Sequence, residues 1–161
     1  MYTKSRTEKK VYEDLTKAEV EAYLPLIKTL KQWSDRKKWV KEPLIRSYVF
    51  VKASEKEYYD ILNINGIVKY VTFEGKAAPI PEWQIDALKA SIDHKLDISV
   101  TTERYKKGEI INISQGPLKG NKGEIVEIQG KKQFLIRIEN IGYSLLVKCP
   151  AMYLESALGV S

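Results

Sequence analysis

Cysteine and histidine are almost absent from this chain of 161 residues. The single cysteine, Cys149, cannot form an intramolecular disulfide, and its apolar neighbours indicate a buried structural thiol in a reducing cytosol. His94 is the only histidine, so neither a histidine-based catalytic pair nor a cluster of zinc ligands has support in the sequence. These absences predict a cytoplasmic protein that is not an enzyme and that uses no metal or cofactor.

Long apolar segments are lacking as well. No apolar segment approaches the ~18 residues that a membrane-spanning helix needs, and the polar, charged N-terminus argues against a signal peptide. The chain carries 27 Lys+Arg against 21 Asp+Glu, a net charge of +6. This moderate basic bias fits a protein that works beside nucleic acid, although many soluble proteins carry as much charge.

Apolar periodicity predicts an α+β domain over residues 1–93, with an antiparallel sheet flanked by helices. In this domain Ser54 and Glu57 have the spacing of a capping box, and Pro25 marks an edge or a bulge in its strand. The expected helices cover residues 5–20, 55–63 and 82–92. The expected strands cover residues 22–31, 47–53 and 67–73.

Residues 94–104 carry little order signal and are predicted to be a linker. Residues 105–155 then show short alternating strands separated by glycines, which favour a small all-β barrel, with a tail over 156–161. In the barrel, Phe134 and Ile136 are expected in the core, whereas Glu124 and Glu127 are interpreted as lying on the solvent side of their strand.

Residues 107–128 read as strand, tight loop and strand. Glycines at the loop are expected to adopt positive φ where the chain reverses, beside a proline with fixed φ. The segment resembles a KOW motif, which occurs in NusG-type factors and in some ribosomal proteins. The residues that carry this resemblance are Gly108, Gly116, Pro117, Gly120 and Gly123.

The N-terminal part also resembles the NusG-type transcription elongation factors. Residues 2–11, 42–51 and 66–73 are similar to three segments of the N-terminal (NGN) domain of that family, in the same order. Residues 48–51 and 73–81 look most like the specialised antiterminators of the RfaH and UpxY kind. The resemblance covers almost the whole chain and implies an NGN domain joined by a linker to an SH3-like KOW barrel.

The resemblance implies a non-enzymatic factor that binds the clamp helices of RNA polymerase and suppresses pausing or termination. It also implies contact with the nucleic acid of the elongation complex, either the non-template strand or the upstream DNA. The barrel would recruit a further partner, such as a small-subunit ribosomal protein or Rho. The alternative is a KOW-containing ribosomal or RNA-binding protein, to which the aromatic residues discussed next would be irrelevant.

In that family an aromatic depression of the N-terminal domain docks on the polymerase. Rigid aromatic side chains give large contact area at low entropic cost, which suits an interface. Strand alternation puts Tyr48 and Phe50 on one face and Val49 on the other, and only one face can pack under helices. The alternative is that the aromatic residues fill the core. The predicted polymerase-binding residues are Tyr2, Tyr48, Phe50, Tyr70 and Phe73.

The stretch 28–41 is strongly basic, with Asp35 as its only acidic residue. Cations neutralise phosphates, and indole rings can stack on unpaired bases. The stretch is predicted to form a hairpin tip that contacts nucleic acid, and the alternative is a solvated loop. The predicted nucleic-acid-binding residues are Lys31, Trp33, Arg36, Lys37, Lys38 and Trp39.

Overall fold

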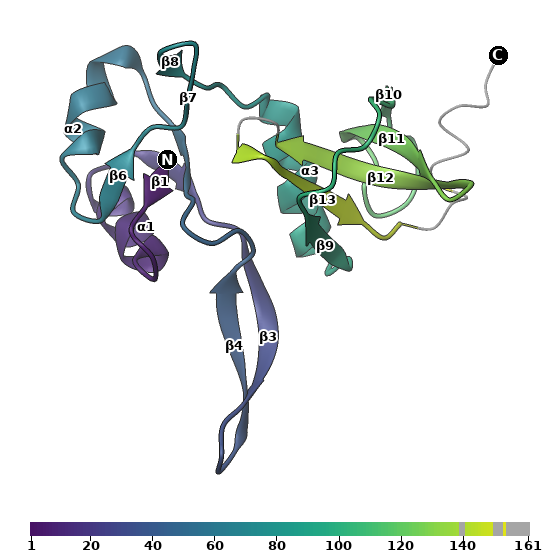
Figure 1. Ribbon diagram of the computed structural model, residues 1–161, viewed down its shortest axis with the longest axis horizontal. Helices are drawn as coiled ribbons and strands as arrows, with labels where there is room; N and C mark the ends of the chain where they lie inside the picture. Colours follow the sequence, from purple (N-terminus) through teal and green to yellow (C-terminus); the bar gives the residue numbers. More distant parts are fainter. Residues whose placement is uncertain (139–140, 150–152, 154–161) are drawn as a thin grey trace. The chain divides into compact units, whose positions relative to one another are not determined.

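The computed structural model describes residues 1–138, 141–149 and 153, and the chain has an α+β fold. It divides into two compact units, Met1–Ala78 and Pro79–Ser161. Figure 1 shows helices and short antiparallel strands in the first unit, and one helix with a larger sheet in the second.

Unit 1 is built from short antiparallel strand pairs. Strand β1 (Tyr2–Thr3) pairs with β6 (Ile67–Lys69), and β2 (Glu21–Tyr23) pairs with β5 (Phe50–Lys52). An isolated bridge between Tyr2 and Tyr48 connects these two pairs through the residues before β5. Two further hairpins complete the unit, β3 (Leu26–Gln32) with β4 (Lys37–Pro43) and β7 (Thr72–Phe73) with β8 (Lys76–Ala77).

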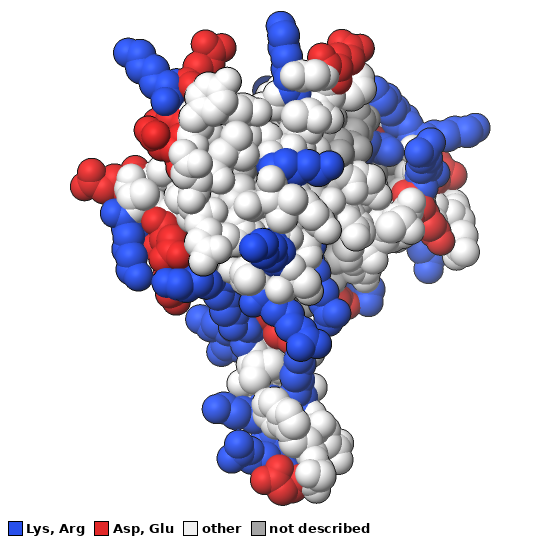
Figure 2. All heavy atoms as spheres, turned by 60° about the vertical axis from the view of Figure 1, so that its left-hand side comes forward, with Lys and Arg blue, Asp and Glu red and all other residues white. Residues whose placement is uncertain are grey.

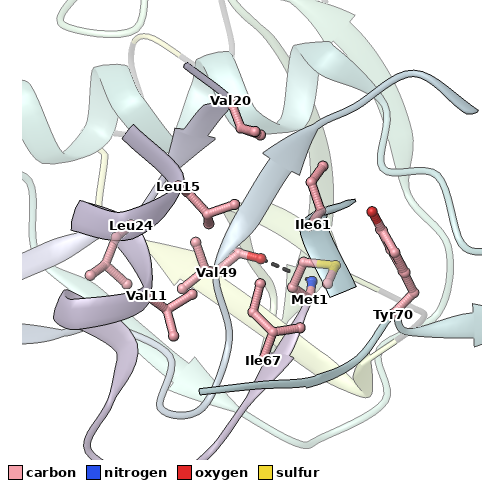
Figure 3. Packing of buried hydrophobic residues seen from close by; sticks show 9 residues of the cluster. All are labelled: Met1, Val11, Leu15, Val20, Leu24, Val49, Ile61, Ile67 and Tyr70. Atoms are coloured by element: carbon pink, nitrogen blue, oxygen red, sulfur yellow. Dashed lines mark hydrogen bonds between the residues drawn. The ribbon is translucent and has the colours of Figure 1, made fainter. Parts of the chain in front are cut away.

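Helix α1 (Glu8–Lys17) and helix α2 (Tyr58–Leu62) provide much of the core of unit 1. Val11 and Leu15 of α1 and Ile61 of α2 are fully buried, and they form one cluster with Val49 (Figure 3). The amino group of Met1 donates a hydrogen bond to the Val49 carbonyl at 2.9 Å inside this cluster. The core therefore lies between the helices and the Val49 side of the sheet.

The capping box predicted at Ser54 is confirmed. Both the backbone N–H and the hydroxyl of Ser54 donate to the Glu57 carboxylate, at 2.8 and 2.7 Å, and the short 3-10 helix η1 (Glu55–Glu57) leads into α2. The strand predicted over 22–31 is split into β2 and β3 at Leu24–Pro25, because proline has no N–H to donate to a strand partner.

Unit 2 contains a five-stranded antiparallel sheet in the order β10-β11-β12-β13-β9. Helix α3 (Glu82–Asp93) contacts β11 and β12 of this sheet. Phe134 and Ile136 are buried in it, as predicted, and so is Leu135 on the opposite face of β12. The strands are β9 (Ile98–Thr101), β10 (Glu109–Asn112), β11 (Lys122–Ile128), β12 (Lys131–Ile138) and β13 (Tyr143–Val147).

The division of the chain differs from the predicted domain limits. Helix α3 belongs to the second unit. Residues 98–101 of the predicted linker form strand β9, which pairs with β13. Ser99 and Thr101 gave little strand signal by themselves, but pairing opposite Leu146 and Ser144 orders them. The predicted tail, 156–161, lies outside the described residues.

The KOW-like loop follows the predicted reversal with one correction. Gly116 and Gly120 have φ of +76° and +85°, as a tight loop requires. The prediction of positive φ at Gly123 is wrong, because this residue lies in β11. A Cβ at Gly123 would fall 1.6 Å from Cε2 of Phe134, so the glycine there allows close packing of the aromatic ring.

Candidate functional site

Four aromatic residues share one face of the sheet in unit 1, and we call them the aromatic surface. Tyr2 bridges to Tyr48, with ring centroids 5.5 Å apart, and Tyr23 pairs with Phe50, with centroids 6.4 Å apart. Tyr48, in the isolated bridge, and Phe50, the first residue of β5, are two residues apart, so their side chains point to the same side. The members of the aromatic surface are Tyr2, Tyr23, Tyr48 and Phe50, all partly exposed.

Val49 shows which side of the strand faces inward. Its side chain is fully buried and packs in the cluster with α1 and α2 residues. Since neighbouring strand residues point to opposite faces, Tyr48 and Phe50 point away from these helices. The structure therefore brings together three of the predicted polymerase-binding residues, Tyr2, Tyr48 and Phe50, and adds Tyr23, which the sequence prediction missed.

A buried carboxylate fixes the turn that precedes Tyr48. The Glu8 side chain, in a residue only 5% exposed, accepts the N–H of Ser47 at 2.7 Å. The Ser47 carbonyl in turn accepts the N–H of Thr3 at 2.9 Å. Ser47 has φ of +62°, a conformation that costs a non-glycine residue energy and that surrounding bonds must hold. These bonds position Tyr48 beside Tyr2.

Tyr70 and Phe73 do not belong to the aromatic surface. Tyr70 lies in the core, where its ring stacks on Tyr58 at 4.1 Å and its hydroxyl donates to the Tyr58 carbonyl at 3.3 Å. Burial, together with the neighbouring Tyr58 and Glu57, raises the pKa of Tyr70. Phe73 is 62% exposed on the separate β7–β8 hairpin. We therefore leave Tyr70 out of the proposed contact residues.

The β3–β4 hairpin projects from the rest of unit 1 (Figure 1) and carries most of the basic stretch. Figure 2 shows lysine and arginine side chains along this projection, with few acidic ones among them. Trp33 at the start of the turn is 45% exposed, and Trp39 on β4 is 64% exposed. The six predicted nucleic-acid-binding residues all lie on this hairpin, from Lys31 to Trp39.

The register divides these residues between two faces. Trp39 pairs with Leu30, and Lys37 lies two residues from Trp39 on the same face. Lys31 pairs with Lys38 on the other face, where the Lys31 ammonium forms an ion pair with Glu42. The hydrogen bond and charge of Lys31 lower the pKa of the Glu42 carboxyl. The two faces therefore differ in how much of their positive charge is compensated.

An ion pair in unit 2 corrects the prediction for Glu124. Its side chain is 8% exposed and accepts two hydrogen bonds from the Arg137 guanidinium, at 2.7 and 3.0 Å, and one from the Gly108 N–H at 2.8 Å. Arg137 also donates to the carbonyls of Tyr105 and Lys106. Burial opposes ionisation, but the bonds from Arg137 and Gly108 outweigh it and lower the pKa of Glu124.

This network fastens residues 105–108 to the sheet at the edge of a pocket of about 320 Å³. The pocket lies within unit 2, between the start of α3 and strands β10 to β12, with Trp83, Ile110 and Arg137 among its lining residues. Across the described parts of the chain there is no cluster of three metal-ligating side chains. Within the same described residues, none of the helices is long and apolar enough to cross a membrane.

Comparison with known proteins places this α+β chain among transcription proteins. The family described as transcription termination factor NusG matches residues 1–89, which is more than half of the chain. The chain therefore belongs to the NusG family. The match covers β1 to most of α3 and so includes both the aromatic surface and the β3–β4 hairpin.

Two individual proteins are similar to the chain. The transcription termination/antitermination protein NusG of Rickettsia conorii is 22% identical over 98 residues, which cover 60% of this chain and 51% of that protein. The chain thus spans about half the length of this curated relative. A solved structure described as "Domain interaction in Thermotoga maritima NusG" aligns with 91% of this chain and 89% of that one, at 20% identity and a TM-score of 0.46.

Proposed function

We propose that this protein is a transcription elongation factor that binds RNA polymerase and suppresses pausing or termination. The proposal rests on membership of the NusG family and on the aromatic surface of unit 1. Binding that favours the active over the paused conformation of the polymerase would suffice, because a ligand shifts such an equilibrium by its difference in affinity. No chemical step is required of the protein.

The observation that carries the proposal is the contrast between Val49 and its neighbours. Val49 packs under the helices, whereas Tyr48 and Phe50 are partly exposed on the opposite face with Tyr2 and Tyr23 beside them. A group of aromatic side chains on the solvent side of a sheet is the composition expected of an interface centre. We infer that this surface contacts the clamp helices of the polymerase, with Phe73 as an outlying contact.

We further infer that the β3–β4 hairpin contacts the nucleic acid of the elongation complex, either the non-template strand or the upstream DNA. The support is its projection from unit 1 and its exposed lysines and indoles. Unit 2 would recruit a further partner, such as a small-subunit ribosomal protein or Rho. Exposed apolar residues on its outer strands, Ile110 on β10 and Val100 on β9, support a protein partner.

The polymerase contact can be tested by capture of purified bacterial RNA polymerase on the immobilised full-length chain. The double variant Tyr48→Ala/Phe50→Ala removes the centre of the aromatic surface. Tyr12→Ala is the matched control, because Tyr12 is a similarly exposed tyrosine (37%) on α1, behind the sheet. We expect the wild type and the control to retain polymerase and the double variant to lose most of it.

The competing possibility, an RNA-binding protein of ribosomal type, gives a different pattern in the same experiment. In that case neither the wild type nor the two variants would capture polymerase, and the wild type would retain ribosomal RNA. Circular dichroism of the double variant distinguishes loss of a contact from loss of folding. A folded double variant that still captures polymerase as well as the wild type would remove the aromatic surface from the interface.

A further inference from the structure

One face of the β3–β4 hairpin is exposed beyond the partly buried Leu26 and Pro43 at its base, and we call this exposed part the Trp39 face. All of its members are exposed. On the opposite face Lys38 is exposed, but Ile27, Thr29, Lys31, Val40 and Glu42 are partly buried. Leu30 and Trp39 lie opposite each other at its centre, 48% and 64% exposed. The Trp39 face consists of Lys28, Leu30, Gln32, Lys37, Trp39 and Lys41.

The charge on this face is positive and uncompensated. Its charged members are Lys28, Lys37 and Lys41, and it carries no carboxylate. Both acidic residues of the hairpin lie elsewhere, Glu42 on the opposite face in its ion pair with Lys31, and Asp35 in the turn. An anionic ligand is therefore attracted more strongly to the Trp39 face than to the opposite one.

The spacing along β4 suits an extended polyanion. Lys37, Trp39 and Lys41 alternate along the strand, so each side chain on this face follows the last by about 7 Å. That interval is comparable to the step between phosphates in an extended single strand. Lys37 and Lys41 are therefore about 14 Å apart and can hold phosphates two steps apart, while the indole between them presents a flat apolar ring to a base.

We propose that the Trp39 face binds a single strand of DNA, with Trp39 stacking on an unpaired base and Lys28, Lys37 and Lys41 binding phosphates. This inference rests on the proposed nucleic-acid contact of the hairpin and specifies its face and its ligand. A single strand is favoured because bases in a duplex already stack on each other and are closed to an indole. The strand is taken to be DNA because the proposed function puts the hairpin beside the DNA of the elongation complex.

The test measures fluorescence anisotropy of a labelled oligothymidylate of roughly a dozen nucleotides, a length that covers the hairpin, with the full-length chain. Trp39→Leu keeps an apolar partner for Leu30 but removes the ring, and we expect it to weaken binding by at least about fivefold. Trp39→Phe keeps an aromatic ring and should retain most of the affinity. Tyr59→Leu is the matched control, because Tyr59 is an exposed aromatic residue (74%) on α2, outside the hairpin, and this variant should bind almost as the wild type does.

Salt dependence tests the phosphate contacts separately. Replacing Lys37 and Lys41 together by glutamine should flatten the slope of log affinity against log salt by about 1.4, since each phosphate contact to a single strand contributes about 0.7. Lys31→Gln with Lys38→Gln, on the opposite face, should change the slope much less. Equal effects of the two pairs would overturn the assignment to one face.

The ligand class is tested by a DNA duplex and an RNA strand of the same sequence. Both are expected to bind more weakly than single-stranded DNA, and tighter binding of either would overturn the proposal. An unchanged affinity of Trp39→Leu would do so as well. Polymerase capture, which depends on the aromatic surface, is measured on the same variants, so failure of the DNA assay with intact capture rejects only this inference.

Discussion

Removing Arg137 tests whether the ion pair with Glu124 holds unit 2 together. In Arg137→Met the Glu124 carboxylate loses two hydrogen bonds, at 2.7 and 3.0 Å, while the side chain remains in a site where it is only 8% exposed. The carbonyls of Tyr105 and Lys106 lose their donor as well. Removing one partner of a buried pair costs about 3–5 kcal/mol, and we expect about 3 kcal/mol here because the site is not completely closed to water.

The stabilities of the wild type and of Arg137→Met should change in opposite directions when the pH falls. In the wild type the pKa of Glu124 is lowered, so its contribution to stability is present above the unfolded pKa and is lost as the pH falls through the folded pKa. In Arg137→Met only the Gly108 N–H and the more distant charge of Lys107 still oppose the effect of burial, so we expect the folded pKa to rise above the unfolded one. The variant should therefore recover part of its lost stability on acidification, whereas the wild type should lose stability.

The assay is urea denaturation at several pH values, followed by the fluorescence of Trp83, which lies on α3 of unit 2. Trp33 and Trp39 are replaced by phenylalanine in every sample, so that the signal reports unit 2 alone. Lys148→Met is the control, because its ion pair with Asp97 is in the same unit but is exposed, at 71% and 62%, and should change stability little. A loss below about 1 kcal/mol in Arg137→Met, or no recovery in acid, would refute the reasoning.

Two further substitutions probe the packing of each unit. Gly123→Ala places a Cβ 1.6 Å from the fully buried Phe134 ring, so we expect unit 2 to lose about 1–3 kcal/mol or more in urea denaturation, a result that an unchanged midpoint would contradict. Leu15→Ala empties a fully buried site of the unit 1 core and should cost about 2–5 kcal/mol, measured by circular dichroism, whereas Thr16→Ala on the exposed side should cost much less.

Local patterns in the sequence predicted the local features of the structure well. The Ser54–Glu57 capping box depends only on two residues three positions apart, and it forms as expected. The inward position of Val49 follows from alternation along a single strand, and the buried positions of Phe134 and Ile136 follow from the same rule. In each case the feature depends on residues that are close together in the sequence, or on a pattern that repeats with the two-residue period of a strand.

Features that depend on distant partners were not predictable in this way. Glu124 has the pattern of a solvent-facing residue, and only the neighbouring strand reveals Arg137 beside it. Tyr70 was expected on the docking face, but its strand is interrupted between β6 and β7, so alternation does not extend to it and it stacks on Tyr58 instead. Tyr23 joins the aromatic surface because β2 pairs with β5 in one particular register.

The division of the basic hairpin into two faces is another feature that could not be predicted from the sequence. The sequence indicated a cluster of cations and indoles, and the exposed positions of Trp33 and Trp39 agree with it. Which of them share a face depends on the pairing of Leu30 with Trp39, which the sequence alone did not specify. Lys28 and Lys41 were consequently left out of the predicted contact residues, although both lie on the Trp39 face.

The proposed function requires a contact between the aromatic surface and RNA polymerase, and its most direct measurement is the affinity of the full-length chain for purified polymerase. We expect the folded Tyr48→Ala/Phe50→Ala variant to bind at least about tenfold more weakly than the wild type, with Tyr12→Ala unchanged. Equal binding by all three proteins, or no binding by the wild type, would contradict the account.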